Sequence, residues 1–413
     1  MYKLKNILPN IEINILITTS FMIFFLYFSY NSINSRTNAI LEFNKAIYLL
    51  FVVAVSISSY FIYTRKITEY PLKKLIALLF IIFSIVISML LNNDYSSANF
   101  ILMMKVVSAF LITFVISKDE FIESYIKAML IICILSLICY ITYFIFGPLL
   151  SSHFPIVYYG DDETKAYVNL YFAFFKLTYG LPRNIGIFRE PGVYQFFINT
   201  ALLFELFFLK KKQNIFIVAI FIITLLTTFS TAGVPVGLLI LFLYLFNKNR
   251  AIINKIQITA VFLILLVIGM KIVDSNPEIA NRFEEMATKA ETDKTSYEVR
   301  YESIFNNIKA SAVKPIFGLG VNNGLIYIQD NFIQYGTKDI TGTFLIFIPI
   351  LGYPLGFFLF YLLWYAMANL AGTSNKIFIF FYFIIFFIAA ISQNLIFDDF
   401  IWVILFASFI REK

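Results

Sequence analysis

Two arginines and a glutamate lie close together in a polar stretch of an otherwise apolar chain. Arg183, Arg189 and Glu190 all fall in the run from Pro182 to Gln195. A guanidinium group stays cationic and offers paired N–H donors to a phosphate. A neighbouring carboxylate can accept a proton from a reacting hydroxyl. These residues are candidates for catalysis on an anionic substrate. Lipid-headgroup contacts by the arginines, and an ion pair or helix cap formed by Glu190, are the alternative interpretations.

A second candidate group lies in the longest polar stretch, between about Val273 and Thr341. Thr295 and Glu298 form a capping-box pattern, which predicts a helix to about Val313. Arg300 flanks the apolar stripe of that helix and is the fourth catalytic candidate, with a solvated surface charge as the alternative. Two aromatic residues on the stripe are candidate sugar contacts, with packing as the alternative: Tyr297 and Tyr301.

A glycine-rich turn from Pro315 to Gly324 follows this helix. Glycines permit backbone conformations that direct N–H groups at an anion. Gly318, Gly320 and Asn322 are therefore candidate substrate-binding residues.

Three further residues stand out at or inside predicted spans: Lys105, Tyr194 and Glu205. An ionisable group in a membrane is costly and often functional. Lys105 is expected either to face an anionic substrate or to pair with Glu205. Tyr194 begins the span after the first arginine group and is a candidate substrate contact.

The spacing of potential ligands predicts no metal site, and no cofactor is expected. The adjacent pair Asp161 and Asp162 suits a helix cap, and Asp398 and Asp399 suit a loop between spans. His153 is the sole histidine. No glycine-rich phosphate loop appears, so nucleotide sugars and ATP have no evident site.

Composition predicts an all-α integral membrane protein. The chain is 60% hydrophobic and 14% charged, which leaves too little polar surface for a soluble protein. Apolar runs near the length needed to cross a bilayer recur throughout. We expect about 12 transmembrane helices, within a range of 10–13, and two long external loops containing short helices. The expected spans are 13–30, 44–63, 74–92, 99–117, 126–147, 193–209, 214–231, 233–247, 255–273, 343–369, 376–395 and 399–411.

Basic residues set the expected orientation, because they concentrate in cytoplasmic loops. Lys and Arg cluster in one set of alternate loops, including 210–212 and 248–255, which places both termini in the cytoplasm. This bias explains the net charge of +7 without a nucleic-acid partner. The two long loops, and with them the candidate site, then face the outside.

Five segments follow along the chain: membrane helices in 1–147, 193–273 and 342–413, and external loops in 148–192 and 274–341. In the first loop, Asp161 or Asp162 is expected to cap an interfacial helix with the stripe Tyr167, Leu170, Tyr171, Phe174 and Thr178. In the second, a helix is expected from Asn276 to about Ala290 before the one that carries Arg300. The overlong run 343–369 contains Pro349, Gly352, Pro354 and Gly356 and is expected to be a broken helix.

The arrangement resembles the O-antigen and capsule polymerase (Wzy) family, within the superfamily that includes O-antigen ligases. The resemblance covers most of the chain and rests on Arg183 to Gln195, Ser230 to Gly233, and Arg300 with Pro315 and 318–320. It implies a metal-independent transfer of a growing glycan from undecaprenyl diphosphate to the non-reducing end of a second lipid-linked repeat unit. It also implies that arginines of the external loops contact the diphosphate.

The resemblance implies a location in a bacterial cell membrane, with lipids and lipid-linked oligosaccharides as partners and a chain-length regulator as a further candidate. A ligase that moves glycan onto a lipid A core is one alternative. The related ligases depend on a histidine in the second loop, whereas His153 lies in the first. A lipid-linked oligosaccharide flippase is the other alternative, although the charges concentrate in external loops rather than inside the spans.

Overall fold

The computed structural model describes residues 10–33, 72–158, 166–177, 182–230, 232–248, 296–332 and 341–410. The expected spans 44–63 and 255–273 and the expected helix from Asn276 to Ala290 lie outside these ranges. The described chain is mostly helical. Its helices are α1 Asn10–Tyr27, α3 Leu72–Leu91, α4 Ser97–Val115, α5 Lys118–His153, α6 Pro191–Leu203, the π-helix η2 Phe204–Phe208, α7 Ile215–Thr227, α8 Gly233–Lys248, α11 Ser296–Ser311, α12 Val321–Phe332, α13 Thr343–Leu351, α14 Tyr353–Ala371, α15 Lys376–Ile391, α16 Asp399–Phe406 and the 3-10 turn η3 Ala407–Phe409.

Among the described residues, three helices are long and apolar enough to cross a membrane: Leu72–Leu91, Lys118–Gly147 and Tyr353–Ala371. Many of their large apolar side chains point outward, including Leu79 and Phe83 on α3. Such a surface is unfavourable in water and suits hydrocarbon.

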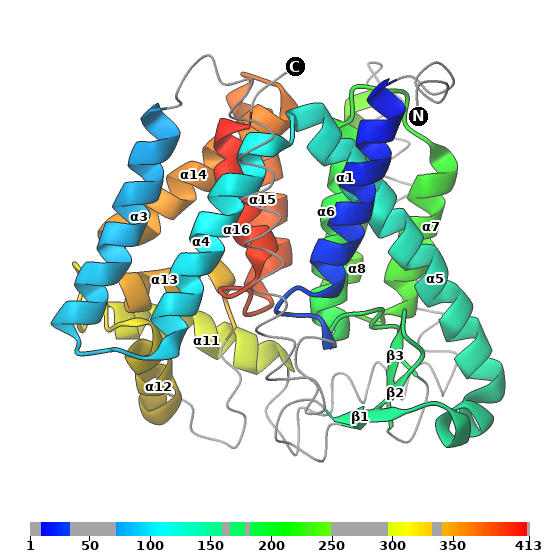
Figure 1. Ribbon diagram of the computed structural model, residues 1–413, viewed down its shortest axis with the longest axis horizontal. Helices are drawn as coiled ribbons and strands as arrows, with labels where there is room; N and C mark the ends of the chain where they lie inside the picture. The colour runs from blue at the N-terminus through cyan, green and yellow to red at the C-terminus, as the bar shows by residue number, and fades with distance from the viewer. Residues whose placement is uncertain are drawn as a thin grey trace, which may run out of the picture.

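The helices run side by side between two ends of the molecule (Figure 1). A small sheet, α11 and α12 gather at one end, and the first turn of α1 lies at the other. The described parts of the two polar stretches therefore contribute to the same end of the bundle.

The first polar stretch is a sheet, so the expected interfacial helix is wrong. Strands β1 Ile156–Tyr158, β2 Ala166–Asn169 and β3 Phe174–Lys176 form an antiparallel sheet in the order β1-β2-β3. The Asn169 side chain accepts a hydrogen bond from the Tyr171 backbone N–H, and Tyr171 has φ 65°. This Asx turn reverses the chain in the middle of the expected helix. Its aromatic and β-branched residues then fit a pleated sheet better than a helix.

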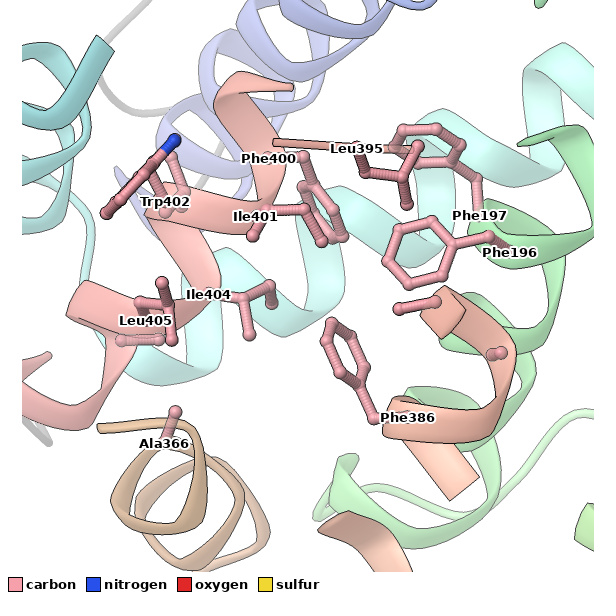
Figure 2. Close-up of a cluster of buried hydrophobic side chains, with 14 of the residues drawn as sticks. Phe196, Phe197, Ala366, Phe386, Leu395, Phe400, Ile401, Trp402, Ile404 and Leu405 are labelled. Atoms are coloured by element: carbon pink, nitrogen blue, oxygen red, sulfur yellow. The ribbon is translucent and has the colours of Figure 1, made fainter. Parts of the chain in front are cut away.

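Helix α16 occupies the centre of the bundle and is buried along its whole length. Figure 2 shows its Phe400, Ile401, Trp402, Ile404 and Leu405 among side chains from α6, α14 and α15. The Trp402 indole N–H donates to the Ile396 carbonyl at 3.0 Å, so its polar atom is satisfied in the interior. The last expected span is therefore a short internal helix that carries buried residues from one loop into the core.

The expected break in the run 343–369 is confirmed. Helix α13 ends at Leu351, Gly352 has φ 89°, and α14 begins at Tyr353. A side chain at Gly352 would collide with the Ile316 carbonyl, so glycine is required there for close approach as well as for its conformation. The break leaves carbonyls of α13 free to accept the N–H groups of Leu319 and Gly320.

The second polar stretch agrees in part with expectation. The helix predicted from about Thr295 to Val313 is α11, Ser296–Ser311. The glycine-rich turn is shorter than expected, because helix α12 already begins at Val321.

Candidate functional site

The loop between α15 and α16, residues 392–398, joins both polar stretches, and we call it the junction segment. The backbone N–H groups of Gly342 and Thr343 donate to the Gln393 carbonyl at 3.1 and 3.0 Å. Asn307 on α11 in turn donates to the Thr341 carbonyl at 3.0 Å. From the other side, the Gln195 amide on α6 donates to the Ser392 hydroxyl at 3.2 Å. Elements distant in sequence thus meet on one short loop.

Arg189 contacts this loop directly. Its Nη2 donates to the Asn394 carbonyl at 3.2 Å, and its backbone N–H donates to the Asn31 carbonyl at 2.9 Å. The Tyr167 hydroxyl of β2 donates to the Arg189 carbonyl at 3.4 Å. These carbonyl contacts orient the guanidinium group and the backbone around it.

Asp398 lies at the end of the junction segment and is completely buried. Its Oδ1 accepts from the Phe400 N–H at 3.0 Å, which caps α16, and its Oδ2 accepts from Asn31 Nδ2 at 2.7 Å. Burial, and then the neighbouring Asp399 carboxylate, raise the pKa of Asp398 to about 6. The expectation of a plain loop at this pair therefore missed a helix cap with a buried titratable group.

Lys105 pairs with Asp399, not with Glu205. Lys105 Nζ lies 2.7 Å from Asp399 Oδ2, and the two side chains are 8% and 3% exposed. The ammonium group also lies 5.4 Å from the centre of the Tyr30 ring. Glu205 instead accepts from the Asn214 N–H at 2.7 Å, at the connection between η2 and α7. Lys105 thus forms an ion pair with the residue that directly follows the junction segment.

Glu190 is exposed immediately beside Arg189. Its backbone caps α6, where the Val193 and Tyr194 N–H groups donate to its carbonyl. Its carboxylate makes no capping bond, so the expected cap is formed by the main chain alone. Because Glu190 is exposed, it is accessible to solvent.

Arg183 is held at the end of α7. Its Nε and Nη2 donate to the carbonyls of Thr228 and Phe229 at 3.0 and 2.7 Å. The Asn184 N–H donates to the Thr227 carbonyl at 2.9 Å, which continues this attachment. The guanidinium group thereby satisfies helix carbonyls that have no partner within the helix, which is a structural role.

The stretches Arg183 to Gln195 and Ser230 to Gly233 are brought together. Asn199 donates to both the Gln195 side chain and the Gly233 carbonyl, at 2.9 and 3.0 Å. The family resemblance rested on both stretches, but it did not predict this contact.

Tyr194 is a core residue. Its side chain is completely buried, and its hydroxyl forms hydrogen bonds with Ser136 at 2.8 Å and Cys133 at 3.4 Å. These partners lie within the helix bundle on α5, so Tyr194 is not kept as a candidate substrate contact.

The glycine-rich turn does face an anion, but the protein supplies it. Asp94 Oδ2, in the loop between α3 and α4, accepts from the backbone N–H groups of Asn322 and Asn323 at 2.8 and 3.3 Å. The N–H groups of Gly318 and Gly320 donate to protein carbonyls. These contacts bind α12 to the α3–α4 loop, and they occupy the donors that the sequence assigned to a substrate.

Hydrogen bonding also sets the ionisation of Asp94. Burial favours the neutral acid, but hydrogen bonds from Ser96, Asn99 and the two α12 amides outweigh it, so the pKa of Asp94 lies below its ordinary value. The carboxylate is therefore charged at neutral pH, where it suits the N-terminus of a helix.

The side chains of Arg300, Tyr297 and Tyr301 lie outside the described part of the structure, although their backbone begins α11. Their expected roles remain predictions. The residues that sequence reasoning missed are polar groups buried at the junction segment. The one available signal was the acidic pair Asp398 and Asp399 between two apolar runs, whereas Asn31 gave none. Compared with models of known protein families and with curated proteins, the sequence matches neither set.

Proposed function

We propose that this chain is a membrane-embedded glycosyltransferase that polymerises lipid-linked oligosaccharides. About twelve spans would place both termini in the cytoplasm of a bacterium and the junction segment at the external face. The substrate is a glycan on undecaprenyl diphosphate, and the acceptor is the non-reducing end of a second lipid-linked repeat unit.

One observation carries the proposal: Arg189 of the first polar stretch donates to the junction segment, which also accepts the N–H groups of Gly342 and Thr343 just after the second polar stretch. The exposed Glu190 follows it directly. A cation and a carboxylate are the two groups that a displacement at a sugar diphosphate requires from a protein.

The reaction balances with these groups. The acceptor hydroxyl attacks the anomeric carbon, and the bond from that carbon to the diphosphate oxygen breaks. The diphosphate leaves with the electron pair, and Arg189 stabilises the charge that develops on it. Glu190 accepts the hydroxyl proton. Arg300 is a further candidate for the diphosphate, and Arg183 shapes the loop that carries both residues.

The test is extension of a lipid-linked acceptor by purified protein in detergent, where transport is impossible. Arg189→Ala is expected to lower the rate by about 100-fold or more, on the scale of losing one oxyanion donor. Arg189→Lys keeps the charge but not the bidentate geometry and should recover only part of it. Lys211→Ala is the matched control, since it removes an exposed cation between η2 and α7 that pairs with Glu123 on α5.

The outcomes separate the alternatives. Transfer of glycan to a lipid A core without chain extension would favour a ligase. Normal extension by Arg189→Ala, Arg183→Ala and Arg300→Ala variants would overturn the assignment of the site. A wild-type protein that moves lipid-linked sugar across vesicles but never extends it would be a flippase.

A further inference from the structure

We infer that Asn31 and Asp398 are positioning residues that hold Arg189 in place for the proposed transfer. The inference rests on the proposed function for its purpose, but the geometry behind it is independent. Asn31 lies in the turn after α1, and Asp398 precedes α16. The two residues are therefore 367 positions apart in the sequence, although their side chains are in contact.

The hydrogen bonds around Arg189 form a closed ring. Asn31 Nδ2 donates to Asp398 Oδ2 at 2.7 Å. The Asn31 carbonyl accepts from the Arg189 N–H at 2.9 Å, and Arg189 Nη2 donates to the Asn394 carbonyl at 3.2 Å. The Asp398 N–H then donates to the Leu395 carbonyl at 2.9 Å, which closes the turn beside Asn394.

The ring fixes Arg189 at two points, its backbone and its guanidinium group. Both points are attached to Asp398, one through Asn31 and one through the turn of the junction segment. Ordering a flexible arginine side chain when an anion binds costs conformational entropy. A side chain that the protein has already ordered avoids this cost, so it binds the anion more favourably. Misplacement of a catalytic group by about 1 Å can cost about 100-fold in rate.

The Asn31 side chain has no other described purpose. Asp398 caps α16 with Oδ1 alone, so the bond from Asn31 to Oδ2 is not needed for the cap. Asn31 is completely buried, and its Oδ1 has no hydrogen-bond partner among the residues that the structure describes. Buried amides normally use all their polar atoms, so an amide kept here at that cost indicates a function for its single bond.

The unused Oδ1 also predicts which substitutions the ring tolerates. An Asp398→Asn variant can cap α16 with its oxygen and donate its amide N–H to Asn31 Oδ1 after the Asn31 amide rotates. Asn31→Asp instead replaces the donor by a second carboxylate, so the ring loses this bond once both carboxylates are ionised. Combining Asn31→Asp with Asp398→Asn exchanges donor and acceptor and restores the bond.

The experiment measures Arg189 in two ways in these variants and in Asn31→Ala. The first is extension of the lipid-linked acceptor in detergent. The second is the rate of phenylglyoxal modification at Arg189, followed by mass spectrometry, with Arg183 as the internal control. Arg183 is held by Thr228 and Phe229 and takes no part in the ring. Gel filtration establishes that each variant is folded.

Asn31→Ala and Asn31→Asp are expected to lower extension between about 10- and 100-fold and to raise modification at Arg189 without raising it at Arg183. Asp398→Asn and the exchanged pair should behave like the wild type in both assays. Equal modification of Arg189 in all folded variants would overturn the inference, and so would failure of the exchanged pair to recover. If the wild type extends nothing, the proposed function fails, while the modification rates still decide whether the ring holds Arg189.

Discussion

Lys105 on α4 and Asp399 on α16 form an ion pair in the interior of the bundle, with Nζ 2.7 Å from Oδ2. Both side chains are almost fully withdrawn from solvent, so neither charge can be satisfied by water. Their mutual attraction therefore offsets a large desolvation cost, and each charge depends on the other.

The first prediction concerns this pair. Lys105→Met alone should lower the free energy of unfolding by about 3–5 kcal/mol, because it leaves a buried carboxylate unpaired. Adding Asp399→Leu should recover most of the loss. Thermal unfolding in detergent gives the coupling through a double-mutant cycle. Lys211→Met, which breaks an exposed pair with Glu123, is the control and should cost about 1 kcal/mol or less. An additive cycle would contradict the buried pair.

A second prediction follows from the raised pKa of Asp398, about 6 against an ordinary 3.8. Between these values the folded state binds the proton more tightly than the unfolded state does. The free energy of unfolding therefore falls as pH rises from 3.8 through 6, and it stays at the lower value above pH 6. The ionisable groups around Asp398 are Asp399, Lys105 and the phenol of Tyr125.

Asp398→Asn removes this ionisation. Its melting temperature should match the wild type at low pH and exceed it above pH 6. The difference in the free energy of unfolding between the two proteins above pH 6 is on the order of 3 kcal/mol, since each pKa unit corresponds to about 1.4 kcal/mol. Melting curves across this range measure it. A difference that stays constant with pH would mean that Asp398 does not titrate there.

Local sequence pattern predicted most helices well. The run 74–92 is helical as α3, Leu72–Leu91, and the run 99–117 as α4, Ser97–Val115. Long apolar runs bounded by polar residues determine helices almost without tertiary information. The break at Gly352 could also be predicted from the sequence, because proline and glycine act on the backbone locally.

The sequence did not predict which residues contact each other across the fold. Lys105 and Asp399 are 294 positions apart, and Asn31 and Asp398 are 367 apart. Periodicity shows which face of a helix is buried, but it does not show which element covers that face. The sheet was missed for a related reason, since the apolar positions around Tyr171 fit a helical stripe and a hairpin equally, and only the Asx turn distinguishes them.

The third prediction concerns the attachment of α12 to Asp94. Asp94→Ala removes the acceptor for two backbone N–H groups and should lower stability by about 1–3 kcal/mol. Asp94→Asn keeps an acceptor and loses the charge, so it should cost only about 0.3–1 kcal/mol. Hydrogen exchange at the α12 amides measures the loosening. Asp330→Ala is the control, because that exposed carboxylate lies in the last turn, where charge opposes the helix dipole.

The sign of the pH dependence at Asp94 is opposite to that at Asp398. A lowered folded pKa means that the contribution is present above the ordinary value of 3.8 and is lost as pH falls through the folded pKa. Acidification should therefore loosen α12 in the wild type and leave Asp94→Ala unchanged. Equal exchange rates in the two proteins at neutral pH would contradict the attachment.

The final prediction compares two glycines. Gly318 has φ 67°, and a methyl group there would collide with the backbone of Ile350 on α13. Gly318→Ala adds to this clash a strained backbone conformation that costs about 1–3 kcal/mol. The substitution should therefore destabilise the packing of the glycine-rich turn on α13. Gly147, on α5, would place the same methyl group 3.6 Å from the Tyr143 ring, an ordinary contact. Gly147→Ala should therefore be neutral or stabilising by up to about 1 kcal/mol, because alanine favours helix. Melting temperatures of the two variants in one detergent make the comparison, and equal losses would mean that close approach at Gly318 does not hold the turn.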